Sequence, residues 1–278
     1  MESTSGLTLL IVAANVLFSW KGFKDSVFFE RYVFDVDKIL IGKEYKRLIA
    51  SGFLHLGWIH LLFNMFSLSA FNTGVELQLG HLEFLTVYFA SLIGGNLFAL
   101  YIHRHHGDYS AAGASGAVCG VMFASIALFP GMHVGFFGIG FSLPGWLFGI
   151  AYILFSIYGI KSKTGNIGHE AHFGGAIIGM VAAIAFYPAA LVENFWVILL
   201  LLLPSLLFIF LVIKRPEYLL IEGYSSSGKY HNVEDRYNIE KSKRQQEMDA
   251  ILEKINQKGM AGLSKKEREK LDEFSKRK

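Results

Sequence analysis

Long apolar runs separated by polar connections occupy most of this 278-residue chain. A helix needs about 20 mainly apolar residues to cross a bilayer core about 30 Å thick. Runs near that length predict seven transmembrane helices, at residues 7–23, 58–75, 82–102, 115–130, 143–160, 169–189 and 194–213. The run at 115–130 is short, and we expect neighbouring glycine and apolar residues to extend it. The pattern predicts an all-α, multi-pass membrane helix bundle.

Two stretches near the N-terminus add to this picture. The connection 24–57 mixes charged, aromatic and apolar residues, and a disordered linker would be poorer in the last two. We therefore expect it to fold, at the membrane interface, where aromatic and basic side chains fit. The first apolar run, Leu7 to Trp20, has no Lys or Arg before it and no small-residue cleavage site after it. We interpret it as a retained helix rather than a signal peptide.

The C-terminal part differs from the rest in charge. Residues 222–278 carry 14 of the 26 Lys and Arg residues and 11 of the 23 Asp and Glu residues. Apolar residues at helical spacing (Met248, Ile251) and a Ser264–Glu267 capping box predict two short helices. A charged, solvated tail without a stable fold is the alternative. We predict a six-helix core over 1–190, a seventh helix over 191–215, a linker over 216–235 and a small soluble helical tail over 236–278.

Composition supports a membrane protein. Hydrophobic residues make up 53% and charged residues 18% of the chain, against about 45–50% and about 25% in soluble domains. The one cysteine, Cys119, cannot form an internal disulfide, so the redox compartment is not indicated. We expect the lipid bilayer as a partner and no nucleic acid, while the partner of the tail is undetermined. The expected location is a bacterial cell membrane.

Polar side chains inside apolar helices are costly and call for a reason. His60 and Asn64 are four residues apart near the start of the second run, so they share one helical face. They can join helices through hydrogen bonds, or they can donate hydrogen bonds in a functional site. A His and an Asn on one face exceed what helix packing usually needs, which favours the functional interpretation.

The fourth run opens with Gly113-Ala114-Ser115-Gly116, and Gly120 follows. Gly116 and Gly120 form a small-xxx-small face that another helix can approach closely. Ala117 stands where a strand-borne G-x-S-x-G nucleophile elbow would have its last glycine. A serine in an apolar helix often only bonds a carbonyl one turn back, so this motif alone is weak.

The sixth run opens with His169, Glu170 and His172, and Gly175 and Gly179 follow. His172 and the two glycines are spaced three and four apart, so they lie on one face. The His-Glu-x-His order is one residue short of the H-E-x-x-H zinc motif. We therefore predict no metal site.

These groups together suggest one chemistry. The two helices could pack against each other through their glycine faces. Ser115 and His172 would then meet at the N-terminal ends of these helices. Neutral imidazole can take the proton of a serine hydroxyl near pH 7 and so create a nucleophile. No intramembrane Asp is an obvious third member, so we predict a Ser115–His172 dyad. His60 and Asn64, with the Ser115 backbone N–H, are candidate oxyanion donors.

The chain resembles the rhomboid family of intramembrane serine proteases. The resemblance covers roughly residues 7–190 and rests on the order and spacing of Arg47, His55, His60–x–x–x–Asn64, Gly74–Val75–Glu76, Gly113–Ala114–Ser115–Gly116 and Ala171–His172 with Gly175 and Gly179. It implies a six-helix core that cleaves transmembrane protein substrates near one membrane face. It also implies the Ser115–His172 dyad, with Gly113 among the residues that support the oxyanion site, and no cofactor.

Two positions depart from the family pattern. The element around Arg47 reads Tyr45-Lys46-Arg47, without the usual tryptophan. Cys119 stands four residues after Ser115, where some members carry an aromatic residue that stacks on the catalytic histidine. Residue 119 therefore provides no ring to stack on the histidine, and the Ser115–His172 dyad does not depend on that ring. His169 is a competing base by composition.

The side of the membrane that the site faces stays open. Family members usually open toward the extracytoplasmic side. The loop 24–57, His103–Arg104 and Lys161/Lys163 lie on one side with the tail, and the positive-inside rule would place that side in the cytoplasm.

Two other functions compete with proteolysis. A non-catalytic scaffold or chaperone on the same fold would bind transmembrane helices without cutting them, but it would not need both Ser115 and His172. A proton-coupled transporter would use His60, His169 and His172 as relay groups, with Glu170 the one acidic residue close to them.

Overall fold

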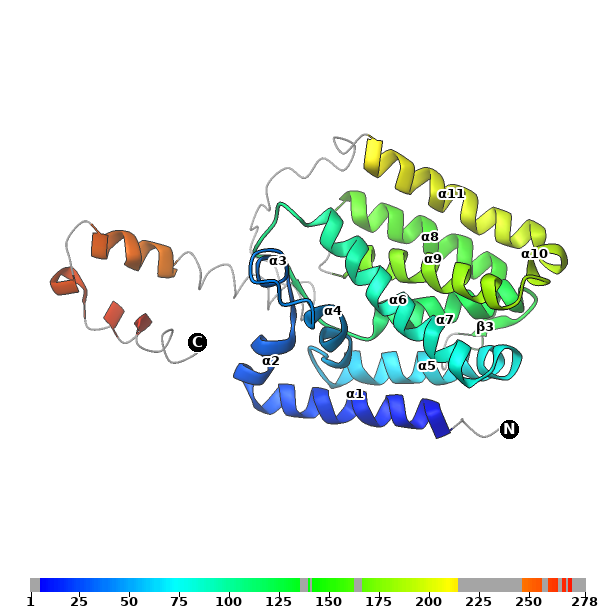
Figure 1. Cartoon of the computed structure of the whole chain (residues 1–278), viewed down its shortest axis with the longest axis horizontal. Helices are drawn as coiled ribbons and strands as arrows, with labels where there is room; N and C mark the ends of the chain where they lie inside the picture. The colour runs from blue at the N-terminus through cyan, green and yellow to red at the C-terminus, as the bar shows by residue number, and fades with distance from the viewer. Residues whose placement is uncertain are drawn as a thin grey trace. The chain divides into compact units, whose positions relative to one another are not determined.

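A computed structural model of the chain describes residues 6–135, 140, 142–162, 167–214, 247–256, 260–264, 267–268 and 270–271 (Figure 1). The α-helices of the first compact unit are α1 (Gly6–Lys24), α2 (Ser26–Tyr32), α3 (Val36–Leu40), α4 (Arg47–Ala50), α5 (Trp58–Leu79), α6 (His81–Ile102), α7 (Ser115–Leu128), α8 (Gly145–Ser162), α9 (His169–Phe186), α10 (Ala190–Glu193) and α11 (Phe195–Lys214). The short elements are β1 (Phe34–Asp35), β2 (Ser110–Ala111), β3 (His133–Gly135), β4 (Ser142–Pro144) and the 3-10 turns η1 (Ser51–Phe53) and η3 (Met260–Gly262).

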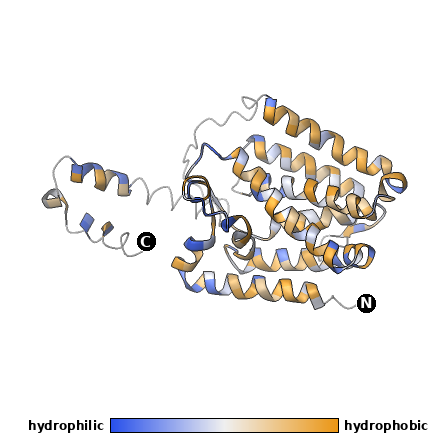
Figure 2. Ribbon diagram, viewed as in Figure 1, coloured by the Kyte–Doolittle hydropathy of each residue, from blue (hydrophilic) through white to orange (hydrophobic). Residues whose placement is uncertain are grey.

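The predicted all-α membrane bundle is confirmed. Among the described residues, α1, α6, α8, α9 and α11 are each long and apolar enough to cross a bilayer. The segment from Arg47 to Phe53 and α5 together form a sixth candidate, bent by 97° at its break. Hydrophobic residues predominate along these helices (Figure 2), and many of their large apolar side chains are exposed. A surface of this kind suits lipid contact, because acyl chains are as apolar as leucine.

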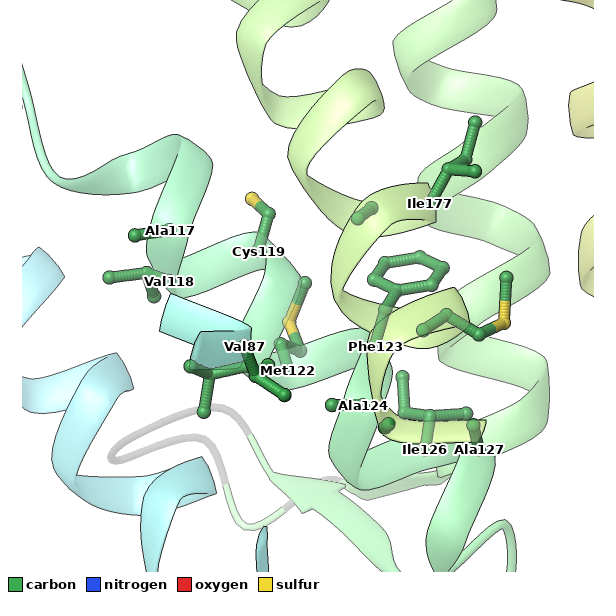
Figure 3. Close-up of a cluster of buried hydrophobic side chains, with 14 of the residues drawn as sticks. Val87, Ala117, Val118, Cys119, Met122, Phe123, Ala124, Ile126, Ala127 and Ile177 are labelled. Carbon is green, nitrogen blue, oxygen red and sulfur yellow. The ribbon is translucent and has the colours of Figure 1, made fainter. Parts of the chain in front are cut away.

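Helix α7 corrects the expected extension of the fourth run. It spans only 14 residues, from Ser115 to Leu128, which is roughly 21 Å at 1.5 Å per residue. Every residue from Gly116 to Leu128 is buried, because α5, α6 and α9 surround the helix. Figure 3 shows its side chains packed with Val87 of α6 and Ile177 of α9. A helix enclosed by other helices need not match the bilayer thickness, so flanking residues are not recruited.

The connection between α1 and α5 is folded, as predicted. The side chain of Arg47 is buried and donates hydrogen bonds to the backbone carbonyls of Glu30, at 2.9 Å, and Val33, at 2.7 Å. Its Nε also pairs with the carboxylate of Glu44 at 2.9 Å. Strand β1 pairs antiparallel with β2, so this connection is tied to the segment immediately before α7.

The C-terminal residues form a second compact unit, which begins at Ser226. Residues 247–256 are helical, and the predicted capping box is present: Ser264 N donates to Glu267 Oε2 at 2.7 Å, and Glu267 N donates to Ser264 Oγ at 3.4 Å. The hydrogen bond from Lys254, with those from Ser264, lowers the pKa of Glu267 to about 2. The predicted linker 216–235 lies outside the described residues, as does 236–246 of the predicted first tail helix.

Candidate active site

Helices α7 and α9 meet backbone to backbone through their glycines. A methyl group added to Gly175 would collide with the backbone of Gly116, and one added to Gly179 would collide with the backbone of Gly120. Small residues at such a crossing allow an approach that larger side chains prevent. The separation of the two helices is therefore fixed by main-chain contact.

This crossing brings Ser115 and His172 together. Ser115 is the first residue of α7, and His172 lies in the first turn of α9, where its N–H donates to the carbonyl of Gly168 at 3.0 Å. The distance from His172 Nε2 to Ser115 Oγ is 2.6 Å. This distance meets the geometric requirement for a general base that abstracts the serine proton.

His169 does not compete for Ser115 in this geometry. Its ring is buried against α8, where a methyl group on Gly159 would collide with it. The ring of Phe155 lies edge-on at 5.0 Å between centroids. The His169 ring therefore faces α8, and its centroid is 6.4 Å from that of His172.

Gly113 and His60 border the serine on its other side. Gly113 has a positive φ of +144°, a region that favours glycine. A Cβ on Gly113 would lie 3.0 Å from His60 Nε2 and 3.5 Å from Ser115 Oγ. The imidazole of His60 therefore lies beside the Ser115 hydroxyl, and a side chain at residue 113 would fill the space between them.

His55 supports this edge of the site. Its ring is buried and lies edge-on to that of His60, with 5.0 Å between centroids. Its Nε2 accepts a hydrogen bond from the N–H of Ala114 at 3.4 Å, and its Nδ1 lies 2.8 Å from Ser19 Oγ. His55 thus links α1 to the backbone immediately before Ser115.

Asn64 lies on the face of His60, as its spacing predicts, but its amide is engaged within α5. Asn64 Nδ2 donates to the backbone carbonyl of His60 at 2.9 Å. An amide nitrogen carries two hydrogens, so one N–H is left for another acceptor. Asn64 is therefore a weaker candidate than His60 for donating a hydrogen bond in the site, because one of its two N–H groups is used within α5.

Sequence reasoning missed Tyr152 of α8. Its hydroxyl lies 3.2 Å from His172 Nδ1 and 2.9 Å from Cys119 Sγ. Cys119 occupies the position where some family members place an aromatic residue, and here an aromatic ring reaches the histidine from a different helix. A tyrosine within an apolar run gives no signal that connects it to a residue 20 positions away.

The acidic residue nearest the site has a structural partner. The buried carboxylate of Glu170 lies 3.2 Å from His103 Nε2, at the end of α6. The ring of His103 stacks on Tyr109 with 3.6 Å between centroids. Glu170 therefore joins α9 to α6. In the described part of the chain, no group of three His, Cys, Asp or Glu residues could hold a metal ion.

The fold and this site define a multi-pass integral membrane protein. A serine and a histidine are in contact at the N-terminal ends of α7 and α9. The chain belongs to the rhomboid family, whose domain model matches residues 42–189. A family of unknown function, DUF6576, matches residues 231–277. The family resemblance predicted from the sequence is thereby confirmed.

Three relatives illustrate the similarity. RHOMBOID-like protein 12, mitochondrial, of Arabidopsis thaliana is 30% identical over 63% of this chain and 56% of its own length. Rhomboid protein 1, mitochondrial, of Saccharomyces cerevisiae is 32% identical over 48% of this chain and 40% of its own. Rhomboid protease GluP of Bacillus subtilis is 28% identical over 75% of this chain and 41% of its own. The chain thus spans about half the length of these relatives.

The named relatives differ in activity and location. They include proteases and one protein called inactive, which supports an intramembrane protease or a related rhomboid function. They also include mitochondrial proteins. The expectation of a bacterial cell membrane is therefore not supported, whereas that of a multi-pass membrane protein is.

Proposed function

We propose that this chain is an intramembrane serine endopeptidase that cleaves transmembrane segments of other proteins. Ser115 is the nucleophile and His172 is the general base. The observation that carries the proposal is the 2.6 Å distance between Ser115 Oγ and His172 Nε2 across a glycine-packed helix crossing. Family membership and the protease relatives support it.

The reaction follows from these two groups. His172 Nε2 takes the Ser115 proton while Oγ attacks the peptide carbonyl carbon, and the carbonyl oxygen becomes an oxyanion. The Ser115 N–H, His60 and the free N–H of Asn64 are the candidate donors to that oxyanion. The imidazolium then gives its proton to the leaving amine, and a water molecule, deprotonated by His172, releases the acyl group from Ser115.

Reconstituted protein and a model single-span substrate in liposomes provide the test. The native chain is expected to cleave the substrate, and Ser115→Ala and His172→Ala are each expected to lower the rate at least about 1,000-fold. Ser125→Ala is the matched control, because Ser125 is also buried in α7 and its hydroxyl bonds Met132 Sδ, away from the site. Cleavage that persists in Ser115→Ala would disprove the mechanism.

The same assay separates proteolysis from a scaffold or chaperone function. A relative named inactive motivates this alternative. A scaffold would retain the substrate on co-purification with no product from the native chain, and Ser115→Ala would change neither result.

A further inference from the structure

Tyr152 occupies a defined position beside the proposed base. The centroid of its ring is 5.8 Å from that of Phe123 on α7 and 5.9 Å from that of Phe148 on α8. Its hydroxyl bridges Cys119 Sγ and His172 Nδ1. The atoms Cys119 Sγ, Tyr152 Oη, His172 and Ser115 Oγ therefore form a continuous hydrogen-bonded series contributed by three helices.

The chemistry of the dyad fixes where the proton of His172 must lie. Nε2 can receive the Ser115 proton only if it carries a lone pair, so the single N–H of the neutral imidazole must be on Nδ1. That N–H points at Tyr152 Oη, which accepts it. When Nε2 becomes protonated, Nδ1–H still donates to the same oxygen, and the imidazolium keeps its partner.

A tyrosine hydroxyl can also donate, and donation to Nδ1 would place the histidine proton on Nε2, facing Ser115. That tautomer is inactive as a base. Cys119 offers the Tyr152 hydrogen an acceptor 2.9 Å away, because its sulfur can accept a hydrogen bond. In that arrangement the phenolic oxygen is free to accept from Nδ1–H. Cys119, which stands where some family members carry an aromatic residue, thus acquires a role in the orientation of the Tyr152 hydroxyl.

We propose that Tyr152, oriented by Cys119, is a positioning residue that holds His172 in the Nδ1–H tautomer with Nε2 toward Ser115. The inference rests on the proposed protease function. It assigns to a neutral phenol from α8 the orienting role that an aspartate has in a serine-protease triad.

Paired substitutions test the proposal kinetically. Tyr152→Phe keeps the ring and removes the hydroxyl. It is expected to lower kcat about ten-fold or more with KM within about two-fold, because the hydroxyl contacts His172 and Cys119 and acts through the base. Cys119→Ala is expected to lower kcat as well, whereas Cys119→Ser, which retains an acceptor, is expected to stay near the native value. Tyr158→Phe is the matched control, since Tyr158 lies exposed on the same helix.

Nitrogen NMR of histidine-labelled protein provides a readout that a merely structural role would not change. The His172 signals are assigned by their loss in His172→Ala. In the native chain Nδ1 is expected to carry the proton and Nε2 to be unprotonated, and Tyr152→Phe and Cys119→Ala are expected to shift the population toward Nε2–H. Equal thermal stability of the variants shows that the fold is retained.

The outcomes separate this proposal from the protease function. If Tyr152→Phe and Cys119→Ala match the native chain in kcat and tautomer while Ser115→Ala is inactive, the role of Tyr152 is disproved and the protease stands. If the native chain does not cleave, the NMR result alone decides, and an Nε2–H tautomer in the native chain overturns the proposal.

Discussion

The two ends of α5 carry polar clusters of different kinds. Near its first turn, His60 lies beside Ser115, which contacts His172, and Asn64 donates to the His60 carbonyl. Near its last turns, Asn72 and Glu76 join α1 and α6. Residues 60 and 76 are separated by roughly 24 Å along the helix.

The second cluster is centred on the carboxylate of Glu76. Asn72 Nδ2 donates to Glu76 Oε2 at 3.0 Å and also to Thr8 Oγ1. Thr8 Oγ1 donates to the same carboxylate oxygen at 3.4 Å, and His81 Nδ1 lies 2.5 Å from Glu76 Oε1. Both carboxylate oxygens therefore have partners, and three helices are joined.

The comparison shows two uses of polar groups in a bilayer. A buried polar group must be hydrogen-bonded to be tolerated, and in the Thr8–Asn72–Glu76–His81 cluster the hydrogen bonds serve attachment. At the other end, the hydrogen bond between Ser115 and His172 aligns the proposed nucleophile with the proposed base, and His60 lies beside Ser115. Substitutions at the two ends are expected to affect different quantities.

The largest effect is expected where main-chain contact fixes the Ser115–His172 distance. Gly175→Ala would force α9 away from the backbone of Gly116, and a misplacement of about 1 Å can lower a rate about 100-fold. We expect at least that loss of cleavage rate in the liposome assay. Gly131→Ala is the control, because a methyl group there meets nothing within 4 Å. A folded Gly175→Ala protein with near-native activity would refute the geometric role of this crossing.

An intermediate effect, on stability rather than rate, is expected at the other end of α5. Asn72→Ala removes donors to Thr8 and to Glu76, and we expect a loss of about 1–3 kcal/mol in the free energy of unfolding. The cleavage rate per folded molecule should not change. Thr86→Val is the control, because Thr86 is exposed and its hydroxyl bonds only its own helix at Leu82. A fall in kcat without a loss of stability would contradict the division between the two clusters.

The smallest effect is expected at the C-terminal end of α7. Asn194 Nδ2 donates to the carbonyls of Ala127, at 2.9 Å, and Leu128, at 3.2 Å. Asn194→Ala should lower the free energy of unfolding by about 0.5–1.5 kcal/mol, measured by thermal unfolding in detergent, and should leave the cleavage rate unchanged. A loss of activity larger than the loss of folded protein would show that this end also serves the reaction.

Much of the bundle follows from the sequence because span length and small-residue spacing are local properties. The spacing of Gly116 with Gly120 and of Gly175 with Gly179 predicts a helix crossing, and these glycines are in contact in the structure. The length of α7 could not be predicted, because burial on all sides depends on its neighbours. The position of Tyr152 depends on how α8 packs against α7 and α9, which no local pattern encodes.

Labelling with a fluorophosphonate tests most directly whether Ser115 is a nucleophile activated by His172. After incubation of the full chain in detergent, mass spectrometry of its peptides identifies the modified residue. We predict a single adduct on Ser115, absent in Ser115→Ala and formed at least about 100-fold more slowly in His172→Ala. An adduct on another serine, or a labelling rate that His172→Ala leaves unchanged, would contradict the proposed dyad.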